Sequence, residues 1–143
     1  MASADVVDPE RLLARLERAR TEIEQLRGQA ALGADALMTD PLQLDAAKYR
    51  LIVAVEACID AAEHVIASER LRRPTSFSDA FTVLAEAGLL TEPTAAAARL
   101  MAGMRNVLVH GYAVVEDDRV VDAILHRLHE LDRLRAELAA VAV

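Results

Sequence analysis

Residues 41–68 read PLQLDAAKYRLIVAVEACIDAAEHVIAS, and this stretch decides the fold. Its apolar residues recur at steps of three and four, the spacing that gathers side chains on one face of an α-helix. The stripe consists of Leu44, Leu51, Val55, Ile59, Ala62 and Ile66, widened by Ile52, Cys58 and Val65. Asp40 is the predicted N-cap and Pro41 the first helical residue. A stripe this wide predicts the central helix of a bundle.

A helix with the same kind of start is predicted before it, over residues 8–32. Asp8 is its predicted N-cap, and Pro9 fits the first turn. Its apolar stripe consists of Leu12, Leu16, Ala19, Ile23 and Leu26. We expect Gly28 and Gly33 to kink or fray the second half of this helix.

A short helix is predicted after Pro74, which cannot continue the preceding one. Ser76 followed by Asp79 resembles a capping box, and Gly88 is the predicted stop.

Two more helices complete the predicted bundle. The first runs from residues 91–93 (TEP) to Gly111. The second opens at residues 116–118 (EDD) and continues without a break to Leu138. Its stripe consists of Val121, Ile124, Leu125, Leu128, Leu131, Leu134 and Leu138.

The composition favours an all-α chain. Hydrophobic residues make up 54% of the 143 residues, aromatics only 3%, and there are five Gly and four Pro. A β-sandwich of this length needs more turn residues. Because most connections are short, neighbouring helices should be antiparallel. We therefore expect one domain over residues 1–143, an up-and-down bundle of four main helices with one additional short helix.

The net charge of −7, from 16 Lys and Arg against 23 Asp and Glu, argues against broad binding of nucleic acid. An RNA or a nucleotide must therefore meet a local arginine cluster, and no DNA partner is expected. Arg70, Arg72 and Arg73 form the densest basic cluster. They are weak candidates for binding RNA or an acidic partner, and the alternative is ordinary solvated charge.

The sequence shows neither a signal peptide nor a membrane-spanning stretch. The first residues, MASADVVDPE, lack the charged and apolar regions of a signal peptide. No apolar stretch approaches the roughly 20 residues that span a bilayer. Cys58 is the only cysteine, so no internal disulfide is possible. We expect a soluble cytoplasmic protein without a membrane partner.

The functional signal is the stretch MRNVLVHGY at residues 104–112, at a predicted helix end. Asn106 and His110 are four residues apart and share a face, whereas Arg105 and His110 lie roughly 140° apart around the helix. Gly111 lets the chain leave the helix, and Tyr112 follows. Taken singly, a cation near a helix C-terminus is favoured by the macrodipole alone. Capping needs only one such residue, so the combination indicates a site.

RNVLVHGY resembles the Arg–four residues–His–any–Tyr motif of the HepT-like branch of HEPN domains, the toxins of toxin–antitoxin pairs. The blocks KYRLIVAVEACIDAAEHVIAS, RPTSFSDAFTVLAEAGLL and MRNVLVHGY are similar to successive blocks of that family, in order. The resemblance covers about residues 44–130. Met104 stands where family members often carry an aromatic residue, which does not touch the chemistry.

The resemblance implies a HEPN-like fold and a metal-independent endoribonuclease without a cofactor, the toxin of a type VII system. It implies a homodimer in which the two motifs face each other across a cleft. It also implies a minimal nucleotidyltransferase antitoxin of the MntA type, which silences the toxin by attaching AMP to the motif tyrosine, here Tyr112. The alternative for Tyr112 is a structural one, in which its ring closes the end of the bundle.

The expected roles agree with the chemistry of these side chains. RNA supplies its own nucleophile, the 2′-hydroxyl. His110 is suited to proton transfer near neutral pH, and Arg105 offers a planar fork to phosphate oxygens. Asn106 orients His110 or binds a phosphate. Two copies of His110 divide the roles of base and acid between them. The competing hypotheses are a non-catalytic HEPN module that binds a nucleotide or a nucleotidyltransferase, and a purely structural helical dimer.

Overall fold

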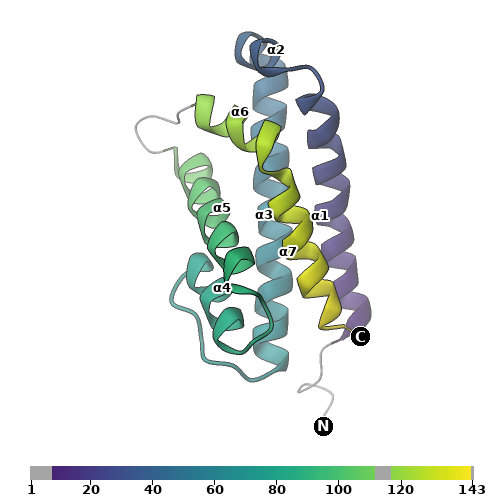
Figure 1. Cartoon of the computed structure of the whole chain (residues 1–143), viewed down its shortest axis with the longest axis vertical. Helices are drawn as coiled ribbons and strands as arrows, with labels where there is room; N and C mark the ends of the chain where they lie inside the picture. Colours follow the sequence, from purple (N-terminus) through teal and green to yellow (C-terminus); the bar gives the residue numbers. More distant parts are fainter. Residues whose placement is uncertain (1–7, 112–116, 143) are drawn as a thin grey trace.

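The computed structural model describes residues 8–111 and 117–142 (Figure 1). Within these ranges the chain forms seven α-helices and no strand. The helices are α1 (Pro9–Ala30), α2 (Ala34–Thr39), α3 (Pro41–Ser68), α4 (Phe77–Glu86), α5 (Glu92–His110), α6 (Asp117–His126) and α7 (Leu128–Ala140). The predicted all-α helical bundle is confirmed, with two differences in where helices begin and end.

The central helix is α3, as predicted. Asp40 caps it, since its Oδ1 accepts hydrogen bonds from the backbone N–H groups of Leu42 at 3.1 Å and Gln43 at 3.3 Å. All six residues of the predicted stripe are buried. The helix packs against α1 along one side and contacts α4, α5 and α7 on the others (Figure 1). Burial of this face removes apolar surface from water and holds the bundle together.

The first difference is at the predicted kink. Helix α1 continues through Gly28 and ends at Ala30, so Gly28 does not interrupt it. Gly33 then opens an additional short helix, α2, that the sequence pattern did not indicate. Its φ of 91° is a conformation that glycine adopts far more readily than other residues.

The second difference is in the predicted last helix, which is two helices. The chain leaves helical geometry at Arg127 (φ −123°, ψ 6°). As a result α6 contacts α2 and α1, while α7 runs beside α1 and α5 (Figure 1). Ile124 and Leu128 are buried on either side of the break, so the apolar stripe alone reads as continuous. Neither Gly nor Pro marks the break, and this is why the sequence did not predict it.

Contacts at the start of α4 and at the start of α5 help to position the end of the bundle that carries the motif. Ser76 caps α4 as predicted, since its Oγ accepts the backbone N–H of Asp79 at 3.0 Å. Helix α4 packs against α5 and α3. The start of α5 is held by α7, where the Glu137 carboxylate accepts the backbone N–H of Thr91 at 2.8 Å.

None of the helices among the described residues has the length and apolar character that crossing a membrane requires.

Candidate active site

The end of α5 presents three of the predicted side chains to one open cavity. Arg105, Asn106 and His110 all line it, although helical geometry places the first and last well apart around the helix. Its volume is about 820 Å³. The other walls are the C-terminal part of α3, the loop between α3 and α4, and Phe77. Gly111 ends α5 with φ 61°, the left-handed conformation typical of a helix C-terminus.

Arg105 is held by contacts on three sides. Its Nε and Nη2 donate to Glu56 Oε2 at 2.9 and 2.7 Å, and its Nη1 donates to Asn106 Oδ1 at 2.9 Å. The guanidinium carbon lies 4.9 Å from the centre of the Phe77 ring, within the range of a cation–π contact. The Arg105 side chain is only 14% exposed. These contacts fix its orientation before any ligand arrives.

The donors of Arg105 are not exhausted by these bonds. A guanidinium carries five N–H groups, and the three bonds to Glu56 and Asn106 leave two of them for a ligand. Phosphate oxygens match this fork geometry. Arg105 therefore lies at the wall of the cavity with three N–H groups bonded to the protein and two left for a ligand.

His110 is exposed at the last turn of α5 and lines the same cavity as Arg105. An imidazole in this position can exchange a proton with a bound ligand. Asn106 lies between the two along the helix, and its carbonyl oxygen is engaged by Arg105. The structure therefore gives Asn106 a contact with the arginine, whereas the sequence left open whether it orients His110 or binds phosphate.

Sequence reasoning missed Glu56 and Phe77, the two residues that hold Arg105 from α3 and α4. One signal for Glu56 was present: it is the only charged residue between Leu51 and Ile59, in the most apolar part of the central helix. A charged side chain in so apolar a stretch indicates a specific partner, and the Glu56 side chain, which is 41% exposed, has that partner in Arg105. Phe77 gave no such signal.

The carboxylate of Glu63, two helical turns after Glu56 on α3, lines the cavity itself. Partial burial, reinforced by the negative charge of Asp60, raises the pKa of Glu63. The α3 wall is therefore acidic next to the arginine and the histidine of α5.

The predicted arginine cluster is divided by the structure. Arg72 pairs with Asp79 and Glu86 at 2.8 and 2.9 Å, away from a role in binding a ligand. Arg73 lines the cavity. Arg70 is exposed in the connecting loop with φ 55°, a conformation uncommon for a residue other than glycine. Tyr112, the predicted site of AMP attachment, lies outside the described residues.

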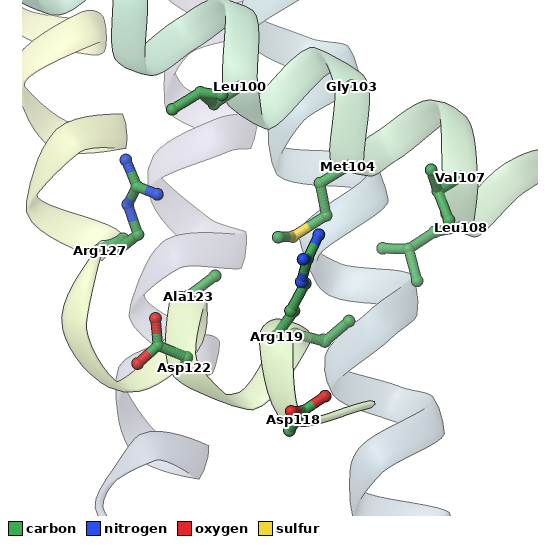
Figure 2. A pocket seen from close by; sticks show the side chains of 11 residues that line it. Leu100, Gly103, Met104, Val107, Leu108, Asp118, Arg119, Asp122, Ala123 and Arg127 are labelled. Carbon is green, nitrogen blue, oxygen red and sulfur yellow. The ribbon is translucent and has the colours of Figure 1, made fainter. Parts of the chain in front are cut away.

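A second cavity of about 790 Å³ lies on the other side of α5, against α6 (Figure 2). Figure 2 shows apolar side chains on its α5 side and charged ones, including Asp122 and Arg127, on the α6 side. Leu100 is 61% and Val107 38% exposed on this face. A Cβ added to Gly103, which lies between them, would meet nothing within 4 Å. The outer face of α5 is therefore apolar and open.

The described residues contain no group of three or more His, Cys, Asp or Glu side chains placed to hold a metal ion.

Known proteins resemble this chain over the residues that form the cavity. The model of the family described as "HepT-like: Ribonuclease HepT-like" matches residues 16–138, which include both helices that form the cavity and the whole motif. The chain belongs to the ribonuclease HepT-like family. The predicted relationship to this family is confirmed.

A curated protein and several solved structures are also similar to this chain. The mRNA nuclease HepT of Shewanella oneidensis is 38% identical over 78 residues, which are 54% of this chain and 59% of that protein. The match thus spans less than two thirds of the length of this curated relative. The solved structure of the tri-AMPylated Shewanella oneidensis HEPN toxin in complex with MNT antitoxin has a TM-score of 0.84. It is 28% identical, and the match covers 91% of this HepT-like chain and 97% of that one. A toxin–antitoxin structure with AMP-PNP has a TM-score of 0.85 at 27% identity, covering 92% and 98%.

Proposed function

We propose that this HepT-like chain is the toxin of a type VII toxin–antitoxin pair, an endoribonuclease that cleaves RNA in a homodimer cleft without a metal ion. The observation that carries the proposal is the single cavity shared by Arg105 and His110, with the Arg105 fork fixed in place and two of its donors available. Because the proposed substrate is RNA, we also propose that the protein acts in the cytoplasm.

The cleavage step uses only groups that RNA and the protein provide. A base removes the proton of the 2′-hydroxyl, and the resulting oxygen attacks the adjacent phosphorus. The bond from phosphorus to the 5′-oxygen breaks, and an acid gives that oxygen a proton. The products are a 2′,3′-cyclic phosphate and a 5′-hydroxyl. Arg105 stabilises the charge that develops on the phosphate oxygens, and His110 of each copy serves as base or acid.

The outer face of α5 supports the homodimer. Leu100 and Val107 are exposed there next to Gly103, which allows close approach of a second helix. His110 lies seven residues after Gly103, almost two full turns of the helix, so it borders this face as well as the cavity. A second copy docked on this face brings its own His110 near the first one, because a twofold interface places the same patch on both sides.

The antitoxin partner is proposed from the solved relatives: one is a HEPN toxin in complex with an MNT antitoxin, and another is a toxin–antitoxin structure with AMP-PNP. In this chain we assign AMP attachment to Tyr112, the tyrosine of the motif. A bulky anionic nucleotide at that position would compete with RNA phosphate for Arg105.

The cleavage proposal is tested with purified, unmodified protein in the presence of EDTA. The wild-type chain should cut RNA and leave 2′,3′-cyclic phosphate ends, detected by mass spectrometry. His110→Ala and Arg105→Ala should each lose about 10²- to 10⁴-fold in kcat/KM. His126→Ala is the matched control, because this histidine is 69% exposed on α6. Cleavage by His110→Ala at the wild-type rate would show that His110 is not catalytic.

The modification is tested by co-expression with a nucleotidyltransferase antitoxin. Intact-mass analysis should show added AMP on the wild-type chain and on Tyr49→Phe, but not on Tyr112→Phe. These are the two tyrosines of the chain, and Tyr49 is 62% exposed, so exposure alone does not separate them. Neutralised toxicity without added mass would mean that the antitoxin only occludes the cleft.

A further inference from the structure

The loop between α3 and α4 is built as a rigid wall of the cavity. The Asp79 carboxylate accepts the backbone N–H of Thr75 at 2.9 Å and its Oγ1–H at 3.3 Å. It also accepts two bonds from Arg72, at 2.8 and 3.0 Å. A loop tied at several points loses little conformational entropy when a ligand binds to it.

Arg72 belongs to this scaffold. Besides Asp79, its Nε donates to Glu86 Oε1 at 2.9 Å. The bond from Arg72, helped by that from Thr75, holds the pKa of Asp79 well below its usual range. The charge of Arg72 is therefore compensated by two carboxylates of α4.

Arg73, the next residue, differs from Arg72 in its contacts and in its place at the cavity. Within the described ranges it has no hydrogen bond and no ion pair. It is exposed, and it lines the same cavity as Arg105 and His110. The rigid loop thus presents an uncompensated guanidinium to the site, in a chain whose net charge is −7.

The charges around the cavity indicate what Arg73 can bind. Arg105 shares its charge with Glu56, and the α3 wall adds Glu63. A strand of RNA brings several phosphates, and each one beyond the scissile phosphate meets this acidic wall unless a cation is near. Arg73 is an exposed cation that lines the same cavity, and its N–H donors are open to solvent.

We propose that Arg73 binds a phosphate of the RNA strand that flanks the scissile phosphate, so that the strand runs from the end of α5 to the α3–α4 loop. This inference rests on the proposed cleavage function. It assigns the sequence-predicted arginine cluster to one phosphate-binding residue, Arg73, supported by one structural residue, Arg72.

The test measures cleavage of a fluorescent single-stranded RNA oligonucleotide over a range of salt concentrations. Arg73→Ala should raise KM about tenfold and leave kcat within about twofold, because a flanking contact acts on binding more than on the chemical step. The slope of log(kcat/KM) against log(salt) should become shallower by about 0.7, the change expected for one lost contact to a single-stranded phosphate. Arg73→Lys should keep most of the slope.

Arg11→Ala is the matched control. It removes the same charge from an exposed position on α1, outside the cavity, and should leave KM and the salt slope unchanged. Arg72→Ala should instead lower the midpoint of thermal unfolding, which Arg73→Ala should not.

The proposal is overturned if Arg73→Ala keeps the wild-type KM and salt slope, or changes them no more than Arg11→Ala. It is also overturned if Arg73→Ala weakens only the complex with the antitoxin. Failure of the cleavage function itself is read separately, from wild-type protein and His110→Ala.

Discussion

At the scale of single residues, the central feature is how Arg105 is held. Its guanidinium lies between the carboxylate of Glu56, the carbonyl of Asn106 and the ring of Phe77. A fixed arginine can act on the transition state without first losing side-chain freedom. We therefore propose Glu56 as a positioning residue that acts on RNA through Arg105.

Glu56→Gln tests this role. A glutamine keeps one oxygen acceptor but removes the charge, and neutral hydrogen bonds contribute about 1 kcal/mol less than charge-assisted ones. We expect kcat for RNA cleavage to fall about fivefold to tenfold while KM does not rise. Asp45→Asn, an exposed change of the same kind on α3, should leave kcat unaltered. A wild-type kcat for Glu56→Gln would contradict the assignment.

The sequence revealed the residues of the site that lie on one helix. Arg105, Asn106 and His110 follow from the helical period and from the resemblance to HepT-like toxins. Glu56 lies 49 positions from Arg105, and their contact depends on how α3 packs against α5. No local pattern encodes that packing. The cation–π contact of Phe77 was hidden for the same reason.

Cys58 allows a test of the buried core. Burial raises the pKa of its thiol to about 12, so almost no reactive thiolate is present at neutral pH. We expect a thiol reagent such as DTNB to label the native protein very slowly, and the unfolded protein at one thiol per chain within the mixing time. Rapid stoichiometric labelling of the native protein would contradict complete burial.

At the scale of elements, helix α5 carries the site and is fixed at its beginning by α7. The Glu137 carboxylate accepts bonds from Thr91 and, at 2.6 Å, from Thr94 Oγ1. A negative charge at a helix N-terminus also interacts favourably with the helix dipole. Because α7 exists as a separate helix, it can lie beside α5 in this way. The sequence predicted both helices' apolar faces but not the break at Arg127 that directs α7.

Glu137→Gln should therefore loosen the start of α5. Burial tends to raise the pKa of Glu137, but bonds from Thr94 and Thr91 outweigh it and lower the pKa below its ordinary value of 4.5. A carboxylate with a lowered pKa stabilises the fold above its unfolded-state pKa and loses that contribution as the pH falls. We expect a loss of about 1 kcal/mol at pH 7 in urea unfolding, shrinking as the pH falls from 5 to 3.

Asp45→Asn provides the comparison for this titration. The Asp45 carboxylate is exposed beyond the first turn of α3, and the variant should unfold like the wild type from pH 7 to pH 3. A difference between Glu137→Gln and wild type that stays constant with pH would exclude the charged carboxylate as the cause.

At the scale of the whole molecule, one chain supplies half of the proposed cleft. It contributes one motif histidine and one motif arginine, and the chemistry calls for a base and an acid. The apolar outer face of α5 is the surface on which a second copy is proposed to dock (Figure 2).

Leu100→Glu should separate the two copies. It places a charge in the middle of this face, where Leu100 is 61% exposed in the single chain. We expect analytical ultracentrifugation to show a folded monomer without RNA cleavage. Leu42→Glu is the matched control, because Leu42 is 83% exposed at the start of α3, and it should remain an active dimer. A dimeric, active Leu100→Glu would place the interface elsewhere.

The contact between Glu56 and Arg105 also bears on product release in the proposed mechanism. There, each cut would leave a cyclic phosphate monoanion beside an arginine whose charge is already paired with a carboxylate. A balanced pair attracts that anion less than a bare guanidinium would, so the fragments would dissociate sooner. The side chain that orients the arginine for cleavage would thereby also free the groove for the next strand, and one molecule could act on many RNA strands.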